Sequence, residues 1–209
     1  MENILLYFLN LPFWEFIAVI LSITYVVLVA QNNIWCWPAA FISTLLFTII
    51  FFDVALLMES LLNVYYMAMA VFGWYKWQFH QQGAQYQELP IQRWRISTHV
   101  KLILGLSVLS LSLGFVMDNY THADYAYLDT FTTVFAVFTT YLVTIKVIEN
   151  WLYWMVINAL SIYLFINKGL HPTALLAFIN FVMCFVGWVK WHQVFKQQRG
   201  DQLAALKLS

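Results

Sequence analysis

Charged residues are scarce in this 209-residue chain, because Asp, Glu, Lys and Arg together make up only 10% of it. Soluble domains average about 25% charged residues, so the composition excludes a domain with a hydrated surface. Nucleic acids are bound by concentrated basic faces. Ten Lys and Arg balanced by ten Asp and Glu supply no such face, so we expect no nucleic-acid partner.

Cysteine is equally rare: Cys36 and Cys184 are the only two, and both lie in apolar runs. A cysteine in such a run is most often a small packing residue, so we expect neither a disulfide nor a metal site. The five histidines show no metal-binding spacing. Phosphate-binding glycine loops and nucleophile elbows are absent as well. We therefore expect no enzyme, no cofactor and no ATP-driven pump.

Hydrophobic residues, in contrast, make up 63% of the chain, and its mean hydropathy is +0.73. This composition predicts an integral membrane protein. A helix needs about 20 apolar residues to cross the bilayer, and seven runs reach roughly that length. They are too long and too continuous for barrel strands. The runs cover residues 13–31, 35–53, 56–78, 99–117, 127–145, 150–167 and 171–193.

One pentapeptide occurs twice, as GWYKW at 73–77 and as GWVKW at 187–191, and the same shift of 114 positions superposes Trp37 on Trp151. We interpret this as duplication of a three-helix unit, with the fourth run as an extra crossing between the copies. The predicted architecture is all-α, with seven transmembrane helices in a 3+1+3 arrangement and parallel repeats related by a pseudo-twofold axis. The predicted segments are a first repeat over 13–78, a loop and linker helix over 79–126, a second repeat over 127–193 and a tail over 194–209.

Positive charge lies almost entirely on one side of these predicted spans. Nine of the ten Lys and Arg fall near the loop at 80–98, the turn after the fifth run and the C-terminal tail, and only Lys168 lies on the other side. The positive-inside rule therefore places the C-terminus in the cytoplasm and the N-terminus on the opposite side of the membrane. The N-terminus carries Glu2 and no basic segment, so we expect no cleavable signal. The polar loop at 80–98 is expected to be exposed. The paired tryptophans of each pentapeptide are expected in an interfacial aromatic belt.

Parallel repeats that face one another are typical of transporters, whose substrate site lies near the membrane midplane between the repeats. Polar and charged residues inside the spans are then candidates for that site. Glu59, Asn63 and Tyr66 share one helical face and offer a carboxylate, an amide and a ring. Glu59 also fits a plain interfacial carboxylate. The Thr-rich run at 129–144 lines a polar path or hydrogen-bonds between helices.

The sixth run carries Trp151, Trp154 and Asn158, which are three and four residues apart and so share one face. Two indoles can hold a flat cation, a contact worth up to about 2 kcal/mol when desolvated. An amide then adds directed hydrogen bonds. The alternative is an interfacial aromatic pair with a helix-packing Asn. Trp37 and Asn180 are further candidates for substrate binding.

Three stretches, FGWYKW at 72–77, IENWLYWMVIN at 148–158 and NKGLHPTALL at 167–176, resemble the Pnu family of bacterial vitamin transporters. The resemblance covers about residues 13–193, and the fold also resembles that of the SWEET sugar transporters. It implies uptake of an unphosphorylated vitamin across the bacterial inner membrane by facilitated diffusion. A cytoplasmic kinase then phosphorylates the product and traps it, with no need to contact the transporter.

The choice of vitamin depends on two positions. Members of the nicotinamide riboside branch (PnuC) usually carry Gln where this chain has Asn63, and often Asn where it has Trp37. The stretch ESLLNVYY at 59–66 is more similar to the thiamine branch (PnuT). We therefore expect thiamine, with nicotinamide riboside as the alternative, since both are flat, cationic and hydroxylated. A channel would need a continuous polar pore, and a membrane enzyme a reactive group, and neither is visible. Whether the chain forms a homo-oligomer stays open.

Overall fold

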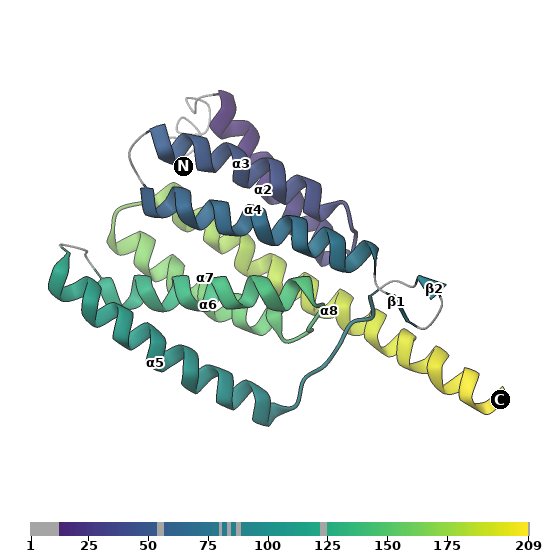
Figure 1. Ribbon diagram of the computed structural model, residues 1–209. Coiled ribbons are helices and arrows are strands. Elements are labelled where there is room, and N and C mark those ends of the chain that lie inside the picture. Colours follow the sequence, from purple (N-terminus) through teal and green to yellow (C-terminus); the bar gives the residue numbers. More distant parts are fainter. Residues whose placement is uncertain are drawn as a thin grey trace.

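The computed structural model is a bundle of long helices lying side by side (Figure 1). It describes residues 13–53, 57–79, 81–82, 85–86, 89–121 and 125–208. The elements in this part of the chain are α2 Phe13–Ala30, α3 Cys36–Asp53, α4 Leu57–Gln78, β1 Gln81–Gln82, β2 Gln85–Tyr86, α5 Ile96–Tyr120, α6 Ala126–Thr144, α7 Asn150–Asn167 and α8 His171–Leu208.

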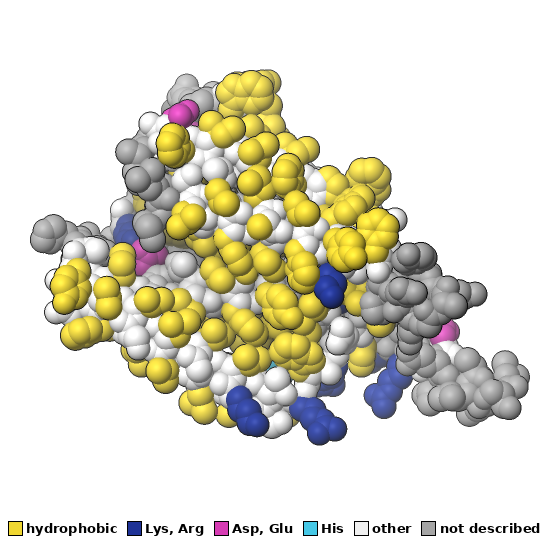
Figure 2. Space-filling model, in the orientation of Figure 1, with side chains coloured by type: hydrophobic (Ala, Val, Ile, Leu, Met, Phe, Trp, Pro, Cys, Tyr) yellow, Lys and Arg dark blue, Asp and Glu magenta, His cyan; other side chains and the backbone are white. Residues whose placement is uncertain are grey.

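The seven predicted runs correspond one to one to these helices, so the all-α membrane fold is confirmed. Within the described residues, five helices (α2, α3, α5, α6 and α8) are long and apolar enough to cross a membrane. The other two, α4 and α7, do not meet this criterion, and they carry amides such as Asn63 and Asn158. Hydrophobic side chains cover the middle of the face that Figure 2 shows, and most Lys and Arg gather where α4 ends and α5 begins.

The helices pack in two groups of three. In the first group α3 packs against both α2 and α4, and in the second α7 packs against both α6 and α8. The groups meet through α4 against α6 and α2 against α8, while α5 packs against α6 at the edge of the bundle (Figure 1). The segment boundaries of the two repeats and their parallel, pseudo-twofold relation stay predictions.

Two turns 114 positions apart have the same backbone geometry. Asn32, between α2 and α3, has a φ of 55°, and Lys146, between α6 and α7, has a φ of 53°. In both turns the next residue donates its N–H over 3.0 Å to the carbonyl five residues before it. This is the Schellman arrangement that ends many helices, and positive φ is uncommon outside glycine. We call the end of the bundle that holds these turns the tryptophan end, because Trp77 and Trp191 lie there.

Four indoles form a continuous row at the tryptophan end. Trp37 and Trp77 meet edge to face at 5.3 Å and 87°, Trp151 and Trp191 do so at 5.6 Å and 87°, and Trp77 lies 6.2 Å from Trp191. All four are at most 4% exposed. The interpretation of both pentapeptide tryptophans as an interfacial belt is therefore wrong for the second one of each pair. These rings lie inside the protein because α4 and α8 turn them toward the opposite helix group.

The glycine that opens each pentapeptide makes room for this row. The ring of Trp37 lies against Gly73, and the ring of Trp151 lies against Gly187. A Cβ atom at either glycine would lie 2.4 Å from the nearest indole carbons, far inside van der Waals contact. The repeated pentapeptide is thus a packing motif in which glycine accepts one indole and the last tryptophan contacts the same indole.

The loop at 80–98 is not exposed throughout, contrary to the expectation from its polarity. Leu89 and Ile91 are buried, and Gln92 exchanges two backbone hydrogen bonds of 2.8 and 2.9 Å with the α6–α7 turn. Pro90 is partly exposed and Gln92 is exposed, so only one side of this segment covers the bundle. Residues 80, 83–84 and 87–88 lie outside the described part of the chain.

We predict that Gly73→Ala and Gly187→Ala each destabilise the protein, because overpacking a filled interior typically costs about 1–3 kcal/mol. The midpoint of thermal unfolding in detergent, followed by size-exclusion chromatography, measures the effect. Gly105→Ala is the matched control, since a Cβ atom there meets nothing within 4 Å. Equal midpoints for all three variants would contradict the packing role of the two glycines.

Candidate substrate cavity

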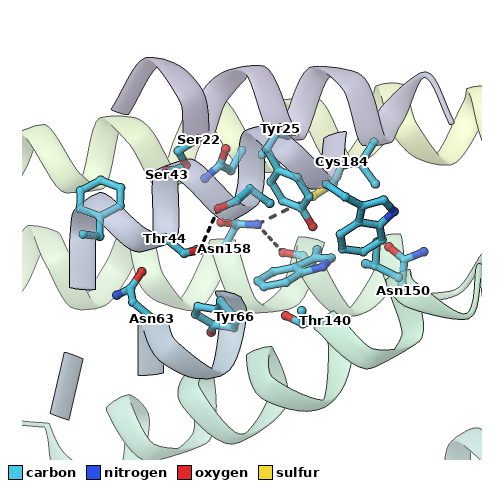
Figure 3. A pocket seen from close by; sticks show the side chains of 18 of the residues that line it. Ser22, Tyr25, Ser43, Thr44, Asn63, Tyr66, Thr140, Asn150, Asn158 and Cys184 are labelled. Atoms are coloured by element: carbon cyan, nitrogen blue, oxygen red, sulfur yellow. Dashed lines mark hydrogen bonds between the residues drawn. The ribbon is translucent and has the colours of Figure 1, made fainter. Parts of the chain in front are cut away.

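A cavity of about 330 Å³ lies among six of the helices and reaches the row of indoles (Figure 3). Cavities of about 300–1,000 Å³ are typical of small-molecule sites. Among the described residues α5 contributes none to the wall. The lining residues are Ser22, Tyr25, Val26, Val29, Trp37, Ala40, Ser43, Thr44, Phe47, Asn63, Tyr66, Thr140, Val143, Asn150, Trp151, Trp154, Asn158, Asn180 and Cys184.

The wall of this cavity is mostly apolar, with several polar groups and no charge. It combines amides, hydroxyls and aromatic rings, and none of the described lining residues is Asp, Glu, Lys, Arg or His. An anionic group such as a phosphate would lose its hydration here without a cationic partner, which is strongly unfavourable. A flat cation, in contrast, can be stabilised by aromatic faces and by amide and hydroxyl oxygens. The cavity therefore suits a neutral or cationic ring compound.

Seven of the eight residues predicted from the sequence line the cavity, and they come from α3, α4, α7 and α8. These residues are Trp37, Asn63, Tyr66, Trp151, Trp154, Asn158 and Asn180. Glu59 lies outside the lining, exposed in the first turn of α4. It shares a helical face with Asn63 but lies about 6 Å further along the axis, at 1.5 Å per residue. Its role as an anion at the mouth stays a prediction.

The indole of Trp151 is a rigid part of the wall. It is 3% exposed and is held between Gly187 and the edge-on ring of Trp191. Trp154, one turn further along α7, is only partly buried. The clamp that the sequence suggested is therefore asymmetric, because Trp151 is held by its neighbours and Trp154 has more freedom to adjust to a ligand.

Asn158 is oriented by two contacts of its amide nitrogen. Nδ2 donates to the carbonyl of Trp154 over 2.8 Å and approaches Sγ of Cys184 at 3.8 Å (Figure 3). Both contacts use the nitrogen, so the amide oxygen is the atom that can accept a hydrogen bond from a ligand. Cys184, expected only to pack, thus belongs to the cavity wall.

Three polar atoms of the lining residues are buried without a hydrogen-bond partner in the described structure: Nε1 of Trp37, Nε1 of Trp151 and Oδ1 of Asn150. An unpaired buried donor or acceptor costs about 1–3 kcal/mol. These atoms have almost no accessible surface, so they lie within the packed wall and do not face the open space of the cavity. Trp37 and Trp151 occupy matched positions 114 residues apart, so the two donors come from equivalent places in the two helix groups.

The start of α7 carries the lining residues Asn150, Trp151 and Trp154. An ion-pair cluster fixes this part of the helix. Glu149 is 8% exposed, and its carboxylate lies 3.3 Å from Nε of Arg93 and 3.6 Å from Nε2 of His99. Arg93 lies in the segment that leads into α5, and His99 lies in the first turn of α5. The segment before α5 and the start of that helix therefore hold the backbone from which Asn150 and Trp151 enter the cavity.

Sequence reasoning missed several lining residues, chiefly small hydroxyls in apolar runs. Ser43 donates to the carbonyl of Ala18 over 2.8 Å, and Thr44 donates to its own helix. Such residues satisfy themselves on nearby backbone, so the sequence around them carries no signal. Thr140 was noticed only as part of a Thr-rich run; it lines the cavity and also donates to its own helix. Asn150 is adjacent to Trp151 in the sequence, but it was not proposed as a site residue because it lies at the end of a predicted span.

The fold and the cavity define a class: helical membrane proteins that accommodate a small polar molecule within the bilayer. The family model described as "Nicotinamide mononucleotide transporter" matches residues 12–193. The chain therefore belongs to this family of membrane transporters, which confirms the resemblance to the Pnu family.

Named relatives and a solved structure agree with this assignment. The nicotinamide riboside transporters PnuC of Escherichia coli (strain K12) and of Shigella flexneri are each 26% identical over an alignment of 191 positions, with 79% of each chain covered. The crystal structure of the vitamin B3 transporter PnuC has the same fold, with a TM-score of 0.72 and 19% identity over 94% of this chain and 88% of that one. None of these relatives is named as a thiamine transporter, so the thiamine branch is not confirmed.

The structure predicts that Asn63→Cys and Glu59→Cys differ in reactivity although they lie one turn apart. In a background with Cys36→Ala and Cys184→Ala, a membrane-impermeant maleimide should modify the exposed Glu59→Cys about tenfold faster or more, since access to a cavity wall requires a minor, open state. Mass spectrometry of timed samples gives both rates. Equal rates would contradict the placement of Asn63 in the wall and of Glu59 outside it.

Proposed function

We propose that this chain carries unphosphorylated nicotinamide riboside across the membrane by facilitated diffusion. The observation that carries the proposal is the uncharged cavity lined by indoles and amides at the meeting of the two helix groups. The names of the relatives support nicotinamide riboside over thiamine, which the sequence had favoured from Asn63 and Trp37. We retain thiamine as a competitor in the test.

The chemistry of nicotinamide riboside matches what the cavity offers. Its pyridinium ring is flat and cationic, so it suits the partly buried indole of Trp154 and the rings beside it. Its carboxamide and ribose hydroxyls can donate hydrogen bonds to the amide oxygens of Asn158 and Asn180, which line the cavity.

The absence of charge from the described cavity wall argues for the riboside rather than the mononucleotide. A phosphate monoester carries about −1.5 to −2 charges at neutral pH and needs cationic or multiple N–H partners. The uncharged wall provides no such partner for it. Phosphorylation inside the cell would therefore convert the transported compound into one that the cavity excludes. Net uptake then needs no ion gradient, only a cytoplasmic kinase that uses the product.

We propose that transport involves movement of the two helix groups relative to each other, as two parallel repeats with the C-terminus in the cytoplasm. The matched turns at Asn32 and Lys146 and the matched indoles Trp37 and Trp151 support the repeat relation. The gathering of Lys and Arg toward the tryptophan end supports this orientation (Figure 2). Rocking about a central site is the usual mode of action of such repeats.

Calorimetry on the detergent-purified protein tests the substrate. We expect nicotinamide riboside to bind and nicotinamide mononucleotide to bind about 100-fold more weakly or not at all, since a buried unpaired charge is so unfavourable. Trp154→Ala should weaken riboside binding about tenfold or more. Trp14→Ala is the control, because Trp14 is 61% exposed and lies outside the cavity lining. Binding of thiamine alone would overturn the proposed substrate and restore the sequence-based expectation.

Uptake into liposomes tests the mode of transport. With a riboside kinase and ATP enclosed, the liposomes should accumulate label above the external concentration; without the kinase they should only reach equilibrium with the bath. Accumulation without the kinase would show coupling to an ion gradient and contradict facilitated diffusion. The Trp154→Ala protein, reconstituted at the same density, provides the background rate.

A further inference from the structure

Two tryptophans bond reciprocally across the helix groups. Trp77 in α4 donates its indole N–H over 3.1 Å to the carbonyl of Thr144, the last residue of α6. Trp191 in α8 donates over 2.9 Å to the carbonyl of Val29, at the end of α2. Each helix group thus gives one donor to the other and receives one in return. Both indoles are the last tryptophan of a GWxKW pentapeptide.

These bonds lie directly behind the cavity wall. Trp37 and Trp151 line the cavity, and each packs edge to face on the bonded tryptophan of its own group. The contact of Trp77 with Trp191 completes the row across the boundary between the groups. All four rings are at most 4% exposed, so the row is buried between the cavity and the tryptophan end.

A buried lysine, Lys146, contacts the ring of one tryptophan in the row, Trp77. Nζ of Lys146 lies 4.1 Å from the centroid of the Trp77 ring, and Lys146 is 3% exposed. Lys146 belongs to the α6–α7 turn, so this cation–π contact also joins the two helix groups. Desolvated contacts of this kind are stronger than exposed ones. Trp77 is therefore held by the opposite group through both its N–H and its ring face.

We propose that Trp77 and Trp191 form a latch that closes the cavity at the tryptophan end. They are positioning residues: they hold Trp37 and Trp151 in the cavity wall, and their two bonds across the groups must break each time the cavity opens to that side. The proposal rests on the transport function proposed above. It adds the residues that control access, which the cavity lining alone does not contain.

The latch is tested by access to the native Cys184, which lines the cavity and is 3% exposed. In a Cys36→Ala background, Trp77→Phe with Trp191→Phe keeps the aromatic rings and removes both N–H donors. A membrane-impermeant, charged methanethiosulfonate is applied to membrane vesicles of each orientation. Labelling of Cys184 from the tryptophan end should rise about fivefold or more, the factor expected when a neutral hydrogen bond is lost. Labelling from the other side should stay unchanged.

Two controls make the result specific. Trp74→Phe with Trp188→Phe makes the same change at the first tryptophan of each pentapeptide, where the rings are only partly buried, and should leave the rate unchanged. Glu59→Cys, in the first turn of α4 and so far from the tryptophan end, identifies the vesicles that expose the opposite side. The rise should therefore appear only in vesicles that do not label Glu59→Cys.

An unchanged rate in a folded double variant, or an equal rise from both sides, would overturn the latch. If the double variant does not elute as a single folded species, the single variants Trp77→Phe and Trp191→Phe are measured instead. Each removes one bond and should give a smaller rise from the tryptophan end only, with the same two outcomes counting against the proposal. Labelling requires no substrate, so a failure of riboside binding would count against the proposed substrate and leave the latch result intact.

Discussion

The row of four indoles at the tryptophan end is the interaction on which the rest of this protein depends. Each glycine of a GWxKW pentapeptide lets one indole pack closely, and each terminal tryptophan bonds to the backbone of the opposite helix group. In the membrane interior no water replaces a lost hydrogen bond, so such bonds hold helices in register more firmly than apolar contacts alone. The row joins the helix groups and also shapes the cavity wall.

The cavity combines an uncharged wall with a small number of polar groups. A transporter must release its substrate, and a wall of charged groups would bind a charged solute too tightly or require it to be stripped of water at high cost. Here many amides and hydroxyls donate hydrogen bonds to nearby backbone carbonyls. Such a wall suits a ring compound with a few polar substituents better than a phosphorylated one.

Much of the fold and of the candidate site could be predicted from the sequence, because the bilayer restricts the possibilities. Long apolar runs must be helices, and the predicted boundaries differ little from those of α2 to α7. Polar residues inside a span are rare enough to attract notice, so Asn63, Asn158 and Asn180 were proposed as site residues, and all three line the same cavity. The structure differs from the prediction outside the apolar runs, where the bilayer imposes no such restriction. The segment at 89–92 is partly buried, and α8 continues to Leu208.

The sequence by itself determined the helices, the family and the residues with unusual chemistry, since composition and spacing are local properties. Only the tertiary structure decided which face each helix turns inward. That choice placed Trp77 and Trp191 in the interior instead of in a lipid-facing belt, and left Glu59 beyond the cavity although it shares a face with Asn63. In a chain that is apolar on nearly every side, hydrophobic periodicity does not distinguish lipid from protein. Close packing against glycine and the pairing of buried N–H groups make that distinction, and both need residues more than 30 positions apart.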